Sequence, residues 1–189
     1  VARDFEPRGY ARQVLKDLDA VQALAKQLGS PAPMSAQAGS LFRILATSPQ
    51  ALEGFLGLNG ALGKGALSVR TRERIALAVA ELNGCDYCLA AHSYLGANVA
   101  KLSNSEINAS RLGTSGNDKA AAAVRFAVNI AKNRGKVSDA ELQAVRAADY
   151  SDAEIVEIIA HVALNTFTNY INEVLGTEID FPVAEQLVA

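Results

Sequence analysis

The most constraining feature of this sequence is a stretch from Gln50 to Phe181 that contains no proline. Because proline breaks the interior of a helix, this stretch can be helical along its whole length. About one residue in five is alanine, only 6% are aromatic and tryptophan is absent, a composition that favours helices over strands. The five prolines lie outside the stretch, at Pro7, Pro31, Pro33, Pro49 and Pro182. We therefore predict an all-α protein.

Length and charge limit the class of protein further. The chain has 189 residues, half of them hydrophobic, which predicts one domain over residues 1–189. Eighteen Lys and Arg stand against 20 Asp and Glu, without a basic block that could follow a phosphate backbone, so we expect no nucleic-acid partner. Apolar runs such as 75–80 are far shorter than the roughly 20 residues of a membrane helix, and the first residues lack a signal-peptide core. We expect a cytoplasmic protein that does not bind membranes.

Apolar residues recur at helical spacing along most of the chain. A one-sided stripe covers residues 14–28. Further helices are predicted at about 35–46, 51–62, 71–82, 85–99, 105–112, 118–133, from 138, and at 151–175. Ser138 with Glu141, and Ser151 with Glu154, have the spacing of a capping box, which marks the start of a helix. On two of these helices we expect certain apolar residues to face inward: Ile75, Val79 and Leu82, and Ile155, Ile158, Ile159 and Val162.

Two cysteines and a histidine stand close together at the start of one predicted helix. Cys85, Cys88 and His92 fall within about 60° of one another around the helix axis, so their side chains can touch. Cysteines this close in such a chain indicate a redox or metal site and not the disulfide framework of a secreted protein. A zinc site would need a fourth ligand, and none is evident nearby. Two buried, inert cysteines are the remaining alternative.

The acidity of a thiol explains why the histidine matters. An ordinary thiol has a pKa of about 8.5, and lowering this value to about 6 needs about 3.4 kcal/mol of preferential stabilisation of the thiolate. A helix N-terminus supplies about 0.3–1 kcal/mol at exposed sites and up to about 2 kcal/mol in favourable ones. A base or cation is therefore needed beside Cys88, and His92 is one helical turn away. The helix dipole itself favours Cys85 as the more acidic thiol, so the order of the two cysteines stays open.

Glu73 is the predicted partner of the histidine. It lies roughly 13 Å up the preceding helix from Leu82, while His92 lies roughly 10 Å up the next helix from Cys85. If the turn at 83–84 folds these helices antiparallel, both side chains arrive at the same level, where the carboxylate would orient His92. Glu81 should instead lie near the turn as a solvated helix end.

These four residues carry a resemblance to a known family. Glu73, Cys85, Cys88 and His92 reproduce the pattern E-x11-C-x2-C-x3-H of the AhpD-like alkyl hydroperoxidases, within the wider carboxymuconolactone decarboxylase family. The resemblance is strongest over about 67–100, and the ending at 169–182 is similar to the peroxidase-related branch. It implies an all-α, AhpD-like helical bundle with the CxxC motif at a helix N-terminus. It also implies a homo-oligomer, since trimers and hexamers occur in the family, and no cofactor.

The same resemblance implies a role for each residue. Cys88 would attack a hydroperoxide and become a sulfenic acid, and Cys85 would resolve it to a disulfide. Glu73 and His92 would form the proton relay. A dithiol reductant, a lipoylated protein in some relatives, would then reduce the disulfide. The expected function is that of a thiol-dependent peroxidase or disulfide reductase.

One position departs from the family pattern. Many of its peroxidases have a histidine between the cysteines, where this chain has Tyr87. A tyrosine, with a pKa of about 10, cannot act as a base at neutral pH, although its hydroxyl can donate a hydrogen bond. We expect Tyr87 to point away from the cysteines and to serve in packing.

Two other functions remain open from the sequence. The chain could be an enzyme like the carboxymuconolactone decarboxylases, which would not use the cysteines. It could also be a redox-sensing interaction module whose disulfide changes the contacts between subunits.

A few further polar residues carry expectations. His161 lies among apolar residues of a helix, which is typical of a core or interface histidine. A polar stripe at helical spacing predicts the lining of a pocket or an interface, and comprises Asn165, Thr168, Asn169 and Asn172. Three arginines near a helix start, Arg70, Arg72 and Arg74, are expected to be solvated or to form salt bridges between subunits.

Overall fold

The computed structural model describes residues 16, 39–185 and 187. Every regular element within these residues is a helix, as predicted. The helices are α3 (Gly39–Leu45), α4 (Pro49–Leu62), α5 (Val69–Asn83), α6 (Asp86–Asn98), α7 (Asn104–Arg111), α8 (Asp118–Lys132), α9 (Asp139–Ala147) and α10 (Asp152–Leu175). The predicted stripe at 14–28 lies outside the described residues, apart from residue 16. The expectation of one domain over 1–189 therefore stays a prediction.

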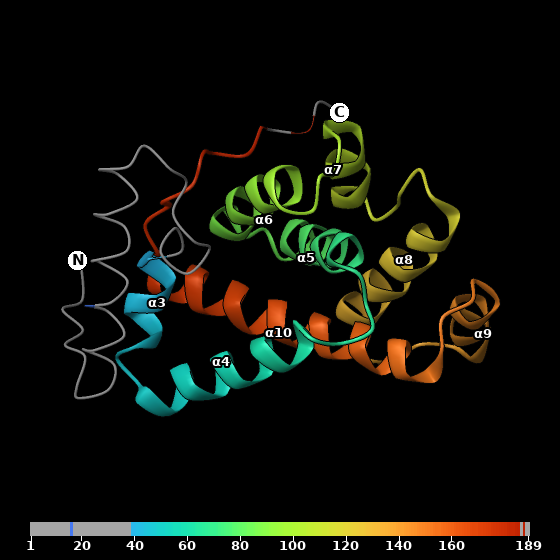
Figure 1. Ribbon diagram of the computed structural model, residues 1–189, viewed down its shortest axis with the longest axis horizontal. Coiled ribbons are helices and arrows are strands. Elements are labelled where there is room, and N and C mark those ends of the chain that lie inside the picture. The colour runs from blue at the N-terminus through green and yellow to red at the C-terminus, as the bar shows by residue number, and fades with distance from the viewer. Residues whose placement is uncertain (1–15, 17–38, 186, 188–189) are drawn as a thin grey trace.

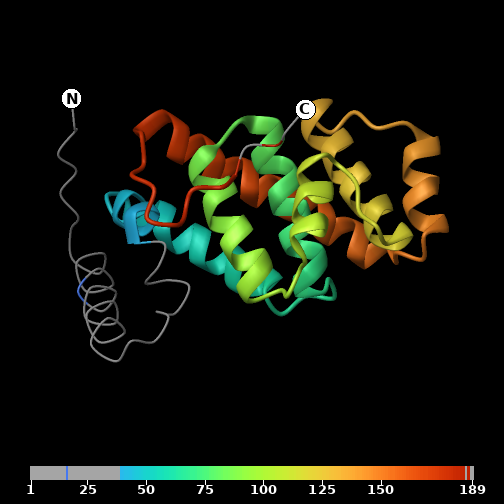
Figure 2. The ribbon, with the colours of Figure 1, turned by 90° about the horizontal axis from the view of Figure 1, so that it is seen from above.

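Helix α5 lies at the centre of the molecule. It packs against α6, α7, α8 and α10, and Figure 1 shows these helices around it. Its middle segment, 75–80, is buried on every side, and Ile75 and Val79 are fully buried as predicted. A helix that is apolar all round is typical of a core position. Figures 1 and 2 both place α8 and α9 at one end of the molecule and α3 at the other.

Helix α10 is the longest element and runs along most of the molecule (Figure 1). Its start is fixed by the predicted capping box, in which the Ser151 hydroxyl accepts from the Glu154 amide and the Glu154 side chain accepts from the Ser151 amide. The other predicted capping box, Ser138 with Glu141, begins α9 in the same way. The helix ends at Gly176, which has a left-handed conformation with φ of +62°. None of the described helices has both the length and the apolarity needed to cross a membrane.

The turn between α5 and α6 sets the position of the CxxC motif. Gly84 has φ of +66°, a left-handed conformation that a glycine adopts without strain, and its amide bonds to the carbonyl oxygens of Ala80 and Glu81. Cys85 follows as the N-cap of α6. Because only this short turn separates two helices that pack together, α6 doubles back along α5. The predicted antiparallel arrangement is confirmed.

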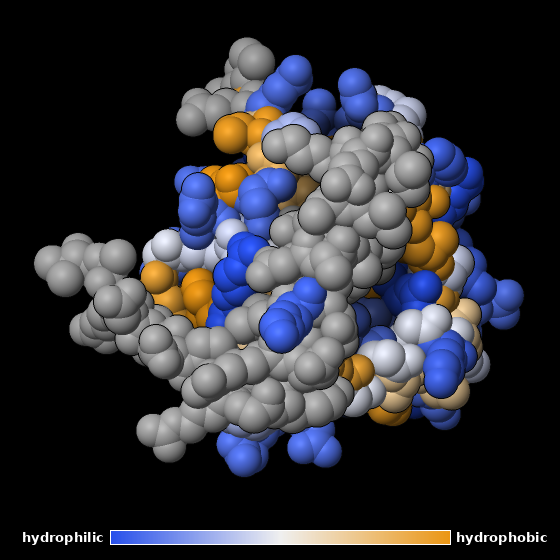
Figure 3. Space-filling view, turned by 60° about the vertical axis from the view of Figure 1, so that its left-hand side comes forward, coloured by the Kyte–Doolittle hydropathy of each residue, from blue (hydrophilic) through white to orange (hydrophobic). Residues whose placement is uncertain are grey.

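Two residues expected to face inward do not. Ile159 and Leu82 are 46% and 41% exposed, whereas Ile155, Ile158 and Val162 are buried as expected. The apolar positions of α10 spread around more of the helix than its neighbours cover, so periodicity alone could not tell the covered side from the open one. Figure 3 shows apolar side chains at the surface in several patches between hydrophilic ones.

The three arginines near the start of α5 all bond within the chain. Arg70 is nevertheless exposed, in line with the expectation of a solvated residue, whereas the buried Arg74 corrects that expectation. Arg74 is buried and pairs with Glu106, with 2.7 Å between Nη2 and Oε2. The other two donate to backbone oxygens, Arg70 to Ala100 at 3.1 Å and Arg72 to Leu62 at 2.9 Å. Their guanidinium groups therefore fasten neighbouring loops to α5.

Candidate active site

Glu73 and His92 meet across the α5–α6 pair, as predicted. His92 Nδ1 lies 2.8 Å from Glu73 Oε2, and the two side chains are only 22% and 13% exposed. With Nδ1 facing the carboxylate, Nε2 is the ring nitrogen left for another partner. The carboxylate therefore fixes both the orientation and the tautomer of the imidazole.

Both cysteines of the CxxC motif are buried free thiols in the first turn of α6. Cys85 is fully buried and does not cap the helix with its side chain. Its thiol instead hydrogen-bonds to Cys88. Cys88 is 3% exposed. The two sulfur atoms are thus in contact, but only the second is reached from a cavity, as described below.

Amide side chains of α10 approach Cys88 from the other side. Asn172 Nδ2 donates a hydrogen bond of 3.1 Å to Cys88 Sγ. Asn169 also lowers the pKa of this thiol, although its Nδ2 has no hydrogen-bond partner among the described residues. Its Oδ1 accepts from Asn83 Nδ2 at 2.8 Å, which ties α10 to the turn before the motif. The polar stripe of α10 is therefore a wall of the site and not an interface. The sequence signal for it was the spacing of four polar residues in an otherwise apolar helix.

The surroundings of Cys88 lower its pKa to about 6. The hydrogen bond from the Cys85 thiol contributes most, while burial opposes it. The positive charge of His92 and the amide groups of Asn172 and Asn169 lower the pKa further. Burial without such partners would raise the pKa of a thiol. Cys88 is consequently a thiolate at neutral pH.

The pKa of Cys85 moves in the opposite direction. It is raised well above its ordinary value, mainly because its proton is shared with Cys88, and also because of burial and the negative charge on Cys88. The directions of the two pKa shifts favour Cys88 as the more acidic thiol, opposite to the effect of the helix dipole. Cys88 is the more acidic thiol because it collects the hydrogen bonds, and these outweigh the dipole that favours Cys85.

The surroundings of His92 favour its protonated form. Burial alone would lower its pKa, but the charge of Glu73, its hydrogen bond and the negative charge on Cys88 together raise the pKa above the ordinary value. A thiolate at Cys88 and a protonated His92 would each stabilise the other.

A cavity of about 420 Å³ opens onto Cys88. Glu73, Cys88 and His92 all line it, whereas Cys85 does not. The walls come from α3, α4, α5, α6, α10 and the segment after α10, and comprise Leu41, Phe42, Phe55, Leu56, Asn59, Tyr87, Ala91, Leu95, Leu164, Asn165, Thr168 and Phe181. Most of these side chains are apolar, which is typical of a site for a small organic molecule.

For Tyr87, the expected direction of the side chain is wrong, but the expected packing role is confirmed. It lines the same cavity as Cys88, so it does not point away from the site. It does serve in packing, since its ring meets Phe181 edge to face with 5.9 Å between centroids. Burial and the charge of Asp180 raise its pKa above the ordinary value. Tyr87 therefore stays neutral and cannot replace a histidine base.

Two other predicted residues lie away from the cavity. Glu81 is not a solvated helix end, because Arg111 Nε lies 2.6 Å from its Oε2 and Arg111 is buried. His161 is buried, as expected of a core histidine, and its Nε2 has no hydrogen-bond partner among the residues that the structure describes. Burial and the charge of Arg72 lower its pKa to about 4, so His161 is neutral.

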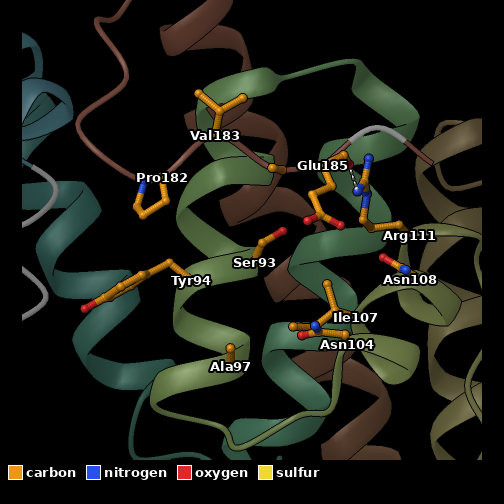
Figure 4. A pocket seen from close by; sticks show the side chains of 11 residues that line it. Ser93, Tyr94, Ala97, Asn104, Ile107, Asn108, Arg111, Pro182, Val183 and Glu185 are labelled. Carbon is orange, nitrogen blue, oxygen red and sulfur yellow. Dashed lines mark hydrogen bonds between the residues drawn. The ribbon is translucent and has the colours of Figure 1, made fainter. Parts of the chain in front are cut away.

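A second, smaller cavity of about 200 Å³ lies between α6, α7 and the C-terminal segment (Figure 4). Figure 4 shows Arg111 beside Glu185, whose carbonyl oxygen accepts a hydrogen bond of 2.6 Å from Arg111 Nη1. No cysteine or histidine lines this cavity. Among the described residues, no group of three or more His, Cys, Asp or Glu side chains is arranged to hold a metal ion.

The four predicted residues fall within a segment that matches a known family. The profile of the carboxymuconolactone decarboxylase family matches residues 49–129, which include Glu73, Cys85, Cys88 and His92. This segment is therefore similar to the carboxymuconolactone decarboxylase family over less than half of the chain. Helix α10, which supplies the amides beside Cys88, lies beyond the part that matches this family. A search of curated proteins found no match.

Solved structures share the fold. The AhpD-core, peroxidase-related protein from Ralstonia eutropha JMP134 has 21% identity and a TM-score of 0.72, with 93% of this chain and 91% of that one covered. A peroxidase-related protein from Silicibacter sp. TM1040 has 19% identity and a TM-score of 0.72, with 94% and 90% covered. The debrominase Bmp8, solved as a Cys-to-Ala variant in complex with 2,3,4-tribromopyrrole, has 18% identity and a TM-score of 0.69, with 94% and 91% covered. The predicted AhpD-like helical fold is thereby confirmed.

Proposed function

We propose that the protein is a thiol-dependent peroxidase that reduces organic hydroperoxides through a cycle between a dithiol and a disulfide. The observation that carries this proposal is the placement of Cys88, whose low pKa and hydrogen bonds make it a thiolate, at the wall of a cavity that also contains the Glu73–His92 pair. A thiolate is the form of cysteine that attacks a peroxide, and a proton donor is needed for the alcohol that leaves.

In the first step, the Cys88 thiolate attacks the terminal oxygen of the hydroperoxide. The sulfur–oxygen bond forms as the oxygen–oxygen bond breaks, and the departing alkoxide takes a proton from the His92 imidazolium. Glu73 holds the ring in place and stabilises its charge before the transfer. The products are an alcohol and the sulfenic acid of Cys88.

In the second step, Cys85 resolves the sulfenic acid. Its sulfur attacks Cys88 Sγ, hydroxide leaves, and the proton that Cys85 had shared with Cys88 leaves with it as water. Once Cys88 is no longer anionic, the effect that kept the Cys85 proton in place is removed. One hydroperoxide and two thiols thus give one alcohol, one water and one disulfide.

The cavity favours substrates with a neutral, apolar body. Its walls include three phenylalanines and several leucines, and no Lys or Arg occurs among the described residues that line it. Glu73 adds a negative charge to the lining. A hydroperoxide on an alkyl or aryl group therefore fits better than one that carries a carboxylate, because the imidazole of His92 is already paired with Glu73 and no other basic side chain among the described residues lines the cavity.

The reductant must reach the disulfide through the same cavity. Cys85 is fully buried and does not line the cavity, so attack must occur at Cys88. A slender dithiol, such as a lipoyl arm of a carrier protein, satisfies this geometry. A cytoplasmic location and assembly as a homo-oligomer are further parts of the proposal, supported by the resemblance to the family.

The test is consumption of cumene hydroperoxide, a neutral aryl hydroperoxide, with dihydrolipoamide as the electron donor. We expect turnover that disappears in Cys88→Ser and after alkylation of the thiols, and a kcat/KM for cumene hydroperoxide above that for hydrogen peroxide. Full turnover in both Cys88→Ser and Cys85→Ser would overturn the proposal. Decarboxylase activity that survives alkylation would favour the other branch of the family instead.

A second candidate function is reductive removal of bromide from an aromatic ring. The observation that favours it is the set of aromatic rings that line the cavity, Phe42, Phe55, Tyr87 and Phe181, which suit a flat apolar ligand. In that reaction a carbon–bromine bond breaks, the carbon takes a proton, bromide leaves and the two thiols become a disulfide. Release of bromide from a brominated pyrrole, without peroxidase turnover, would select it.

A further inference from the structure

Helix α10 has a second stripe of residues on the side opposite the site. Six apolar residues recur at offsets of 0, 3, 7, 11, 14 and 18, and are Val156, Ile159, Ala163, Phe167, Tyr170 and Val174. At 100° per residue they fall within about 80° of one another. The four polar residues that face the site are centred almost 180° away. The outer stripe is thus a separate surface, independent of the chemistry at Cys88.

This outer stripe is open to solvent in the single chain. All six residues are exposed, and the five large ones are between 39% and 79% exposed. No charged side chain lies within the stripe, and the nearest exposed acidic residues, Asp152 and Glu173, stand at its two ends. A solvent-facing helix surface normally carries charged residues, so an uncharged stripe of this length indicates a covered surface.

We infer that this face of α10 pairs with the same face of a second copy of the chain, with the two helices antiparallel across a two-fold axis. The positions of the stripe are symmetric about residue 165 to within one residue. In an antiparallel pair Val156 therefore lies opposite the copy's position 174, Ile159 opposite position 170, and Ala163 opposite position 167. A two-fold interface requires a surface that is complementary to itself in this way.

The side chains at these positions also fit by size. Near the axis the small Ala163 faces a large aromatic position, and further out an aliphatic side chain faces the aromatic position 170. Large side chains that meet small ones let two helices approach to the usual 8–10 Å. Parallel packing in the same register would place Phe167 against itself and Ala163 against itself, which leaves a clash beside a gap.

The area of the stripe is sufficient for a specific contact. It is about 27 Å long, from the rise of 18 residues. Its exposed side chains present roughly 600 Å² of mostly apolar surface on each copy, or about 1,200 Å² in the pair, which reaches the lower end of the range for stable interfaces. This two-fold contact by itself produces a dimer, and together with a second, different interface it produces a larger even-numbered assembly such as a hexamer, but not a trimer.

The test is sedimentation equilibrium of the full chain and of variants at two positions that this pairing places opposite each other. The wild type should be an even-numbered assembly at tens of micromolar protein. Ile159→Arg and Tyr170→Asp should each raise the dissociation constant by at least about tenfold, because each buries a charge without a partner. Val99→Arg, at a residue with 49% exposure outside α10, is the matched control and should leave the assembly unchanged.

The double variant Ile159→Arg with Tyr170→Asp tests the antiparallel register directly. Each arginine would then face an aspartate of the copy, so the double variant should recover assembly relative to either single variant. Circular dichroism melting should show that all variants fold. A monomeric or trimeric wild type, single variants that assemble like the wild type, or a double variant no better than the singles would each overturn the inference.

Discussion

The start of α6 has one side toward the cavity and one toward the core. Cys88 lies on the cavity side and Cys85 on the core side. Cys88 faces the cavity, the His92 charge and the amides of α10, and its pKa falls to about 6. Cys85 faces the core, is fully buried, and its pKa rises. The two residues have the same chemistry and almost the same place on the helix dipole. Their difference indicates that neighbouring hydrogen bonds and charges outweigh helix position in setting the pKa of each thiol.

The two histidines repeat this contrast. His92 pairs with Glu73 beside the cavity, and its pKa is raised. His161 is buried without a partner at Nε2 among the described residues, and its pKa is lowered to about 4. The surroundings therefore favour the protonated form of one histidine and the neutral form of the other.

The largest effect is expected from exchanging the cysteines one at a time. Cys88→Ser should lower kcat/KM for a hydroperoxide by at least about a thousandfold, because a serine hydroxyl does not ionise at neutral pH. Cys85→Ser should instead consume one equivalent of peroxide and stop at a sulfenic acid, which dimedone labelling and mass spectrometry would detect at Cys88. Equal peroxide consumption by Cys88→Ser and Cys85→Ser would contradict the different roles proposed for the two cysteines.

The next largest effect concerns the proton donor on the cavity side. His92→Ala should lower kcat/KM by about a hundredfold, in the range for loss of a general acid. Glu73→Gln should lower it by about tenfold, since the imidazole remains but its cation is less stable. The matched control is Glu81→Gln, on the same helix, which removes the ion pair with Arg111 and should leave kcat/KM within about twofold.

A smaller effect should follow from loss of one amide. Asn172→Leu keeps the volume of the side chain but removes the hydrogen bond to Cys88 Sγ. A hydrogen bond to a charged group is worth about 1.5–3 kcal/mol, so the pKa of Cys88 should rise by about one unit or more. The pH at which kcat/KM reaches half its maximum should rise with it. Asn165→Leu, whose amide donates to the His161 carbonyl, is the control and should not shift this pH.

The smallest expected effect is on the free energy of unfolding, whose pH dependence should differ in sign between His161 and His92. His161 has a pKa of about 4 in the folded chain against about 6.5 unfolded, so the unfolded chain binds more protons between these values. The free energy of unfolding should fall as pH drops from 6.5 to 4, by up to about 3 kcal/mol from this group. His92, whose pKa is raised, should act with the opposite sign, with its contribution lost as pH rises.

Urea unfolding at neutral pH and near pH 4.5 would measure this difference. The loss of stability on acidification should be smaller in His161→Gln than in the wild type, because glutamine does not titrate. An equal loss in both proteins would show that His161 is not held neutral in the folded chain.

Local chemistry predicted much of the fold. The capping boxes at Ser138 and Ser151 depend on residues three apart, and the turn at Gly84 depends on one glycine, so sequence spacing was enough to find them. The Glu73–His92 contact was predicted because the short turn fixes the register of α5 and α6. Such features need no knowledge of distant parts of the chain.

Features that depend on distant segments could not be predicted. The hydrogen bond from Asn172 to Cys88 joins positions 84 residues apart, and its stripe could equally have lined an interface. Tyr87 was misplaced because Phe181, far along the chain, packs against its ring beside the cavity. Ile159 was assigned to the core because periodicity does not show which side of a helix is covered.

The most direct test of a Cys88 thiolate is a titration of thiolate absorbance in the ultraviolet. The reduced wild type should show one thiolate with a pKa of about 6, which is absent in Cys88→Ser. In Cys85→Ala this transition should remain but move to higher pH, because the strongest hydrogen bond to the sulfur is lost. A wild-type midpoint near the ordinary thiol value of about 8.5, or a low midpoint that persists in Cys88→Ser, would contradict the account.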